Sequence, residues 1–176
     1  MLWPLSWRRR KGPKYNGDAD FADRTFDGKL VSGSVMIKSE FDDTLDWLKL
    51  FREISTLIEA ECGVMYLIAP PEESARTPGY SVYCKPMGPG IRKKQLPNIG
   101  WATYFGSMFK QELDVDLVRS RGYHVEELAG GYLILMSDSI GDILSDFPTF
   151  SRRRAELKKC FRPDLFEITR EVGDPP

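Results

Sequence analysis

The strongest hydrophobic pattern in this chain lies between Asp42 and Gly63. From Trp47 to Ile58, apolar side chains follow steps of four, three and four residues, which places them in one stripe along a helix. Asp42 or Asp43 can cap the start of this helix, and Gly63 supplies the positive-φ residue that often ends one. The spacing therefore predicts an amphipathic helix with one face turned to a core.

Two apolar runs flank this helix. Residues 29–39 are rich in β-branched side chains and include Gly33, so they predict a strand that bends at the glycine. Residues 64–69 are almost wholly apolar and stop at Pro70-Pro71, which indicates a buried strand. Strand, helix and strand in this order suggest a βαβ-like unit, with the parallel pairing inferred from the order alone.

The segment 70–98 is dense in proline and glycine and holds one short strand candidate, residues 80–84. We expect a long, partly irregular excursion, and such loops are often functional. Gly88-Pro89-Gly90 superficially resembles a phosphate-binding loop. No Gly-Lys-Ser/Thr completes the motif, which argues against nucleotide binding.

The next elements are predicted to be two helices. Residues 101–112 place aromatic side chains on one side of a helix, and Trp101, the first of them, is expected to be buried. Asp114 can cap a shorter helix that stops at Gly122.

A hairpin and a final helix complete the pattern. Residues 123–128 and 132–137 suit two arms joined across Ala129-Gly130-Gly131. Pro148 fits the first turn of a helix that runs through Cys160.

Together these elements predict a single α+β domain over residues 29–170. We expect a mixed or antiparallel sheet of about five strands packed against three to four helices. Residues 1–28 are rich in charge and show little periodicity, so they predict a basic leader or loop that contributes little stability. Residues 171–176 are predicted to form a tail. The full length of 176 residues suits one domain with a proper core.

The chain carries no strong overall charge. It has 25 basic and 26 acidic side chains, a formal net charge of −1, so electrostatic recognition must come from local patches. Arg152-Arg153-Arg154 would spread around a helix and no aromatic platform interleaves with them. The sequence therefore does not favour nucleic acid as a partner.

Candidate catalytic groups are sparse. The three cysteines, Cys62, Cys84 and Cys160, stand too far apart in sequence for a metal knuckle or a CxxC pair, and their odd number fits a reducing compartment. His124 is the single histidine, and no nucleophile motif such as GxSxG accompanies it. One histidine cannot build a multi-His metal site. We expect no catalysis, no cofactor and no metal.

The first residues place an apolar stretch ending at Trp7 before the basic run from Arg8 to Lys11. A secretory signal has the reverse order, and no apolar run has the length of a bilayer span. Trp3 and Trp7 with this basic run would make a poor membrane anchor. We expect a cytoplasmic protein without a membrane partner.

Three short motifs lie between residues 99 and 143: Ile99-Gly100-Trp101 leading to Tyr104-Phe105-Gly106, Gly130-Gly131-Tyr132-Leu133-Ile134, and Ile140-Gly141-Asp142-Ile143. With them the chain resembles the bacterial type VI secretion immunity family, whose members protect a cell by neutralising antibacterial effector toxins. The resemblance covers about residues 29–165, in pattern more than in identity. The family has a longer N-terminal portion and usually a proline before the Gly-Asp turn, where Ser137-Asp138-Ser139 stands here.

The resemblance implies an immunity-type protein that binds its cognate effector toxin and occludes the toxin's active site. Loops and polar groups outside the core are the parts most easily shaped to one partner. The candidate contact residues are Glu72, Glu73 and Arg76 in the excursion, and Asp138, Asp142 and Asp146 in the turn before the last helix.

Other interpretations of these residues stay open. The three aspartates also suit capping and solvent-facing roles. A small enzyme would gather His124 with carboxylates in a deep pocket. A nucleic-acid-binding accessory protein would present a continuous Arg/Lys face.

Overall fold

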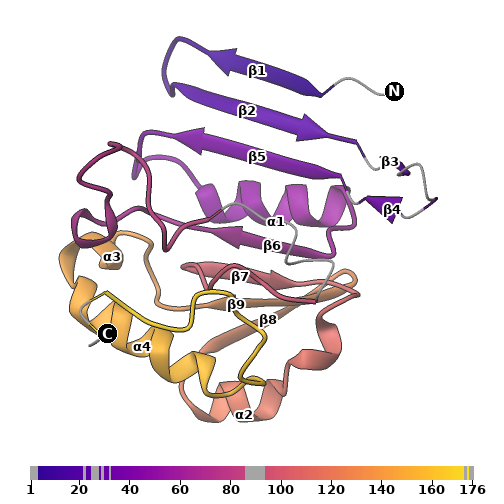
Figure 1. Cartoon of the computed structure of the whole chain (residues 1–176), viewed down its shortest axis with the longest axis vertical. Helices are drawn as coiled ribbons and strands as arrows, with labels where there is room; N and C mark the ends of the chain where they lie inside the picture. Colours follow the sequence, from indigo (N-terminus) through magenta and orange to yellow (C-terminus); the bar gives the residue numbers. More distant parts are fainter. Residues whose placement is uncertain are drawn as a thin grey trace. The chain divides into compact units, whose positions relative to one another are not determined.

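The computed structural model describes residues 4–21, 23–24, 28, 30–31, 33–85, 94–172 and 174 (Figure 1). Helices and antiparallel sheets make up an α+β fold, which confirms the predicted class. The chain divides into two compact units, Met1–Leu45 and Asp46–Pro176.

The first unit is built on a three-stranded antiparallel sheet with the order β1-β2-β5. Its strands are β1 (Leu5–Arg9), β2 (Tyr15–Asp20) and β5 (Ser34–Ser39). The short strands β3 (Asp23–Arg24) and β4 (Leu30–Val31) pair with each other. Gly33 falls between β4 and β5, which belong to different sheets, so the single bent strand predicted for this region is wrong.

The prediction of a leader or loop before residue 28 is wrong for β1 and β2. Trp7 lies directly opposite Gly17 in their pairing. A Cβ atom at Gly17 would stand 2.1 Å from the Trp7 ring, so only glycine leaves room for the indole. The contact joins residues ten positions apart, and local composition carries no sign of it.

The second unit holds a four-stranded antiparallel sheet with the order β6-β7-β9-β8 (Figure 1). Its strands are β6 (Cys62–Met65), β7 (Ala102–Phe105), β8 (His124–Leu128) and β9 (Gly131–Leu135). Its helices are α1 (Trp47–Leu57), α2 (Val115–Ser120), α3 (Asp142–Ser145) and α4 (Phe147–Lys158), with the 3₁₀ turns η1 (Pro70–Glu72) and η3 (Lys110–Glu112).

Both faces of this sheet are packed. Gly63 and Tyr104 are paired across β6 and β7, and the Phe51 ring of α1 lies 3.0 Å from where a Cβ atom of Gly63 would stand. On the opposite face Phe105 stacks on Phe161, just after α4, with ring centroids 5.3 Å apart. Alternate residues of a strand point to opposite faces, so α1 and the end of α4 cover different sides.

This burial on both faces explains why the helix predicted over residues 101–112 is wrong. Residues 101–112 were predicted to form a helix, but all four residues of β7 are buried and only Lys110–Glu112 forms a 3₁₀ turn. A short run that is apolar on both sides fits a central strand as well as a buried helix. The burial of Trp101 is confirmed, because only 3% of its surface is exposed. The parallel βαβ unit is also wrong, because β5 and β6 belong to different sheets.

Local signals located the other elements well. Asp114 caps α2 by accepting a hydrogen bond from the Leu117 amide at 2.9 Å. The hairpin of β8 and β9 turns at Gly130, whose φ is 83°. Pro148 lies in the first turn of α4, as predicted. The prediction that Asp42 or Asp43 caps α1 is wrong. The cap is Asp46, which accepts from the Lys49 amide at 2.8 Å, and the helix ends at Leu57, before Gly63.

Candidate functional site

Residues 70–85 are the described part of the predicted excursion, here named the excursion loop; Gly88-Pro89-Gly90 lies outside the described residues. The strand predicted at 80–84 is wrong, since no strand forms there and residues 82–84 are bends. The loop is closed on itself: the Ser74 amide donates to the Tyr80 carbonyl at 2.8 Å. The Gly79 amide donates to the Glu73 carboxylate at 2.7 Å. These bonds give the loop a defined shape.

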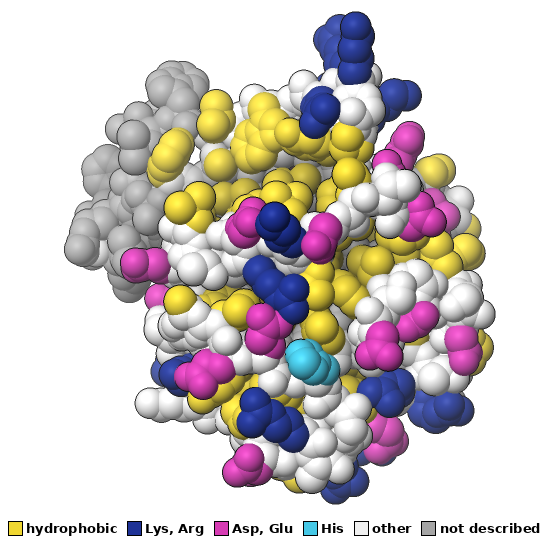
Figure 2. Space-filling view, turned by 180° about the vertical axis from the view of Figure 1, so that it is seen from behind, with side chains coloured by type: hydrophobic (Ala, Val, Ile, Leu, Met, Phe, Trp, Pro, Cys, Tyr) yellow, Lys and Arg dark blue, Asp and Glu magenta, His cyan; other side chains and the backbone are white. Residues whose placement is uncertain are grey.

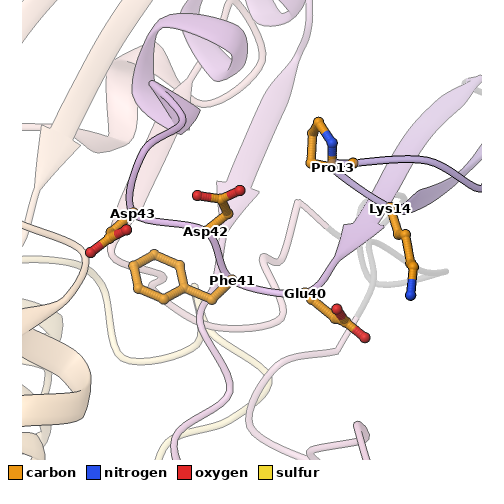
Figure 3. Close-up of a pocket in the computed structure, with 7 residues that line it drawn as sticks. Pro13, Lys14, Glu40, Phe41, Asp42 and Asp43 are labelled. Atoms are coloured by element: carbon orange, nitrogen blue, oxygen red, sulfur yellow. The ribbon is translucent and has the colours of Figure 1, made fainter.

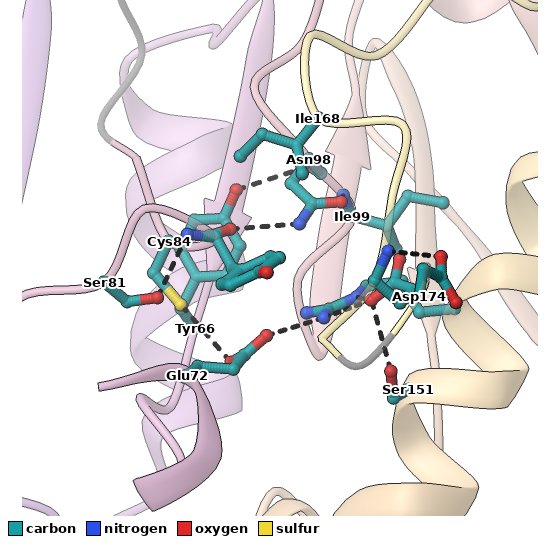
Figure 4. A network of polar contacts seen from close by, with 12 residues as sticks. Tyr66, Glu72, Ser81, Cys84, Asn98, Ile99, Ser151, Ile168 and Asp174 are labelled. Carbon is teal, nitrogen blue, oxygen red and sulfur yellow. Dashed lines mark hydrogen bonds and ion pairs between the residues drawn. The ribbon is translucent and has the colours of Figure 1, made fainter. Parts of the chain in front are cut away.

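Glu72 anchors the excursion loop from inside the second unit. Its side chain is 1% exposed, and a carboxylate oxygen accepts a hydrogen bond from Arg154 Nη2 of α4 at 2.6 Å. Figure 4 shows Glu72 pointing into this polar network. The prediction of Glu72 as an exposed contact residue is therefore wrong, because its charge is used inside the protein.

The same network reaches the C-terminal segment. Arg154 Nε donates to the Glu171 carboxylate at 2.7 Å, and Lys158 Nζ donates to its other oxygen at 2.6 Å. Burial opposes the charge on Arg154, but hydrogen bonds to Glu171 and the charge of Glu72 outweigh it and raise the Arg154 pKa. Burial lowers the pKa of Lys158 despite its bond to Glu171. Two carboxylates and two cations thus balance in the interior.

The outer side of the excursion loop combines apolar and charged groups. Tyr80 is 42% exposed and Val82 is 51% exposed. Glu73 and Arg76 are exposed beside them in the chain. Apolar residues with a charged surround on a preformed loop are typical of protein-binding surfaces. The sequence pattern missed Tyr80 and Val82 because it placed them in a strand, although Pro78-Gly79 marks a turn directly before them.

The second predicted set, Asp138, Asp142 and Asp146, surrounds α3. Asp142 accepts a hydrogen bond from the Ser139 amide at 3.2 Å. Asp146 accepts from the Thr149 amide at 3.2 Å and caps α4, and the bonds with Thr149 lower its pKa. The capping role is thus confirmed for Asp146, whereas Asp142 is the first residue of α3 and bonds to the turn that precedes the helix.

Asp138 differs from these two aspartates. It is exposed and makes no hydrogen bond or ion pair with any described residue. Leu144, also on this turn, is 48% exposed and was not predicted as a contact. No hydrogen bond or ion pair among the described residues joins this turn to the excursion loop directly. Both are attached to α4, one through Asp146 at its first turn and the other through Arg154 farther along.

The Arg152-Arg153-Arg154 triplet spreads around α4 as predicted. Arg152 is exposed and donates to the Thr149 hydroxyl at 3.2 Å. Arg153 donates to the carbonyls of Met136 and Gly122, and Arg154 is buried. The triplet therefore forms no basic stripe. Figure 2 shows basic and acidic side chains interspersed on one face, with hydrophobic side chains between them.

His124 is exposed on β8. Glu126, two residues further along β8, forms an ion pair with Arg52 of α1, with 2.5 Å between the guanidinium nitrogen and the carboxylate oxygen. In the first unit, a cavity of about 510 Å³ carries one ammonium and three carboxylates in its lining (Figure 3). Its lining residues are Gly12, Pro13, Lys14, Glu40, Phe41, Asp42 and Asp43, which do not include His124. The arrangement expected of the enzyme alternative is thus not present in this cavity.

The three cysteines are partly buried, and this leads to a first prediction. Burial raises the pKa of the Cys62 and Cys84 thiols to about 12, with Glu61 adding to the shift at Cys62 and Glu72 at Cys84. Only the thiolate reacts with iodoacetamide, so at pH 8 we expect both to be alkylated at least about a hundredfold more slowly than free cysteine. Mass spectrometry of the folded protein gives the rates. Alkylation of Cys84 at the free-cysteine rate would contradict its burial, and the urea-unfolded protein is the control.

Comparison with protein-family models, curated proteins and solved structures finds no match. The resemblance to immunity proteins therefore stays a prediction. None of the helices in the described ranges has both the length and the apolar character that crossing a membrane requires.

Proposed function

We propose that this protein binds another protein through the outer side of the excursion loop, and that the partner is a bacterial effector toxin. The observation that carries the proposal is the loop itself. Tyr80 and Val82 are exposed on a segment that a buried ion pair fixes in place. Apolar side chains exposed on a preformed loop suit a partner's surface. The sequence resemblance supplies the kind of partner.

Binding would neutralise the toxin by covering its active cleft. Because the hydrogen bonds of Ser74 and Gly79 already shape the loop, little conformational entropy is lost when it docks. Tyr80 would supply the apolar contact, and aromatic residues at the centre of an interface often dominate its energy. Arg76 and Glu73 would surround it, with charge pairs that raise the association rate. Asp138 and Leu144 are the second candidates for contact.

The test requires a toxin gene adjacent to the gene of this protein, and it consists of co-expressing the two. We expect the wild type to restore growth and to co-purify with the toxin. Replacing Tyr80 and Val82 together, by Ala and Ser, should weaken binding by about thirtyfold or more, since loss of an aromatic hot spot costs about 2 kcal/mol or more. Leu57→Ala on α1 is the matched control, because Leu57 is 83% exposed but lies outside the loop.

Each result has a clear meaning. A Tyr80/Val82 variant that binds as tightly as Leu57→Ala would show that the excursion loop is not the contact surface. A wild type that neither binds nor protects would contradict the immunity function. Asp142 and Asp146 are left unchanged in this test because they hold α3 and α4 in place.

A further inference from the structure

The sheet of the first unit has one apolar and one polar face. The strand register aligns Leu5 with Ala19 and Val35, and Trp7 with Gly17 and Ile37. Directly paired residues project to the same side, so these side chains share a face. The alternate positions, among them Ser6, Arg8, Asn16, Asp18 and Lys38, lie on the other face.

Strand β1 is an edge of this sheet. The strand order is β1-β2-β5, and no other described strand pairs with the outer side of β1. An edge strand presents backbone N–H and C=O groups that can pair with a further strand. Leu5 is 56% exposed on this edge. The edge is therefore open to an added strand.

The edge is also basic. Arg8, Arg10 and Lys11 are exposed and form no ion pair with any described residue. Arg9 is different, because its guanidinium donates to the carbonyls of Lys11 and Gly12 at 2.9 and 3.0 Å and so shapes the turn after β1. One role of basic residues on an edge strand is to prevent aggregation through edge-to-edge pairing. The same charges would attract a strand that carries carboxylates.

Two other occupants fit less well. A second copy paired through β1 would bring Arg8 and its basic neighbours close to the same residues of the other chain, which like-charge repulsion disfavours. A membrane surface would need Trp7 to enter the lipid. The Trp7 indole instead lies across Gly17 in its own sheet.

We propose that β1 binds an extended acidic segment of a partner protein, which adds to the sheet as a fourth strand. Main-chain hydrogen bonds would supply the affinity and alternating side chains the specificity. Acidic side chains of the segment would stand beside Arg8, and apolar ones beside Leu5 and Trp7. This surface belongs to the first unit and does not depend on the excursion loop.

The test is a titration of the full chain with a nine-residue peptide in which Glu and Val alternate, followed by amide hydrogen exchange and NMR. We expect slower exchange and shifted signals at residues 5–9. Arg8→Glu should weaken binding by about tenfold or more, because opposed charges become like charges. Lys38→Glu is the matched control. It makes the same charge change on the same face, on the far strand β5, and should change binding by less than about threefold.

The remaining outcomes would overturn the proposal. Equal binding of a peptide with Lys in place of Glu would remove the charge preference. Protection of residues 5–9 without peptide, increasing with protein concentration in parallel with dimer formation, would assign the edge to a second copy. Signal changes at the same residues with phosphatidylserine vesicles but not with the peptide would assign it to a membrane. Binding by Arg8→Glu equal to that of wild type would exclude Arg8 from recognition.

Discussion

Replacing Arg154 by methionine is expected to lower the free energy of unfolding by about 3–5 kcal/mol, the typical cost of removing one partner of a buried ion pair. The guanidinium holds Glu72 on one side and Glu171 on the other, and all three side chains are at most 4% exposed. Without it, Glu171 keeps Lys158 and the Ser151 hydroxyl at 3.4 Å, and Glu72 keeps a weak contact from the Cys84 thiol at 3.8 Å. Urea denaturation followed by tryptophan fluorescence measures the loss.

Two control variants separate this effect from a general sensitivity of α4. Arg152→Met removes a neighbouring arginine that is exposed and should change stability by less than about 1 kcal/mol. Adding Glu72→Gln to Arg154→Met restores charge balance in the interior and should recover part of the loss. A single Arg154→Met variant as stable as Arg152→Met would show that the network contributes nothing, and the proposed anchoring of the excursion loop would then be wrong.

Replacing Trp101 by alanine is expected to destabilise the protein by about 3–5 kcal/mol, the usual cost of truncating a buried tryptophan. Trp101 is 3% exposed, and its indole N–H donates to the Ser137 hydroxyl at 3.1 Å. Its main-chain groups bond to Met65 and Met136, and these bonds do not depend on the side chain. The variant thus isolates the loss of the ring. Denaturant titration against wild type gives the value.

Trp101→Phe and the Tyr80→Ala, Val82→Ser double variant complete this series. The phenylalanine keeps most of the ring volume and loses the bond to Ser137, so about 1–2 kcal/mol is expected. The Tyr80→Ala, Val82→Ser double variant removes two exposed side chains and should cost less than about 1 kcal/mol, which would also show that this binding variant folds normally. A loss below about 1 kcal/mol for Trp101→Ala would contradict its burial.

Predictions from local sequence were correct where the interaction that fixes the structure joins residues only a few positions apart. Asp114 caps α2 because an aspartate can reach an amide three residues along. Gly130 turns the hairpin because only glycine adopts a positive φ there without strain. Pro148 lies in the first turn of α4 for a similarly local reason. The class of fold and these boundaries could therefore be predicted before any contact was known.

The candidate site followed the sequence only in part. The excursion was located from its prolines and glycines, and Arg76 and Glu73 are exposed on it as expected. Glu72 looked equivalent to Glu73 in sequence. The structure separates them, because Glu72 meets Arg154 from a segment 82 residues away, whereas Glu73 closes its own loop through Gly79. The burial of Glu72 depends on this distant partner, and the local sequence around Glu72 does not reveal the pairing.

The sequence by itself determined the α+β class, the cap of α2, the hairpin turn and the burial of Trp101, because each follows from backbone geometry or from hydrophobicity over a few residues. Tertiary structure alone decided that 102–105 is a central strand, that β1 and β2 form a sheet, and that Glu72 is an interior anchor. These features depend on which segments meet: the buried sides of β7, Trp7 over Gly17, and Arg154 between two carboxylates. Pairings between distant residues form only when the whole chain packs, since they require burial that no isolated segment provides.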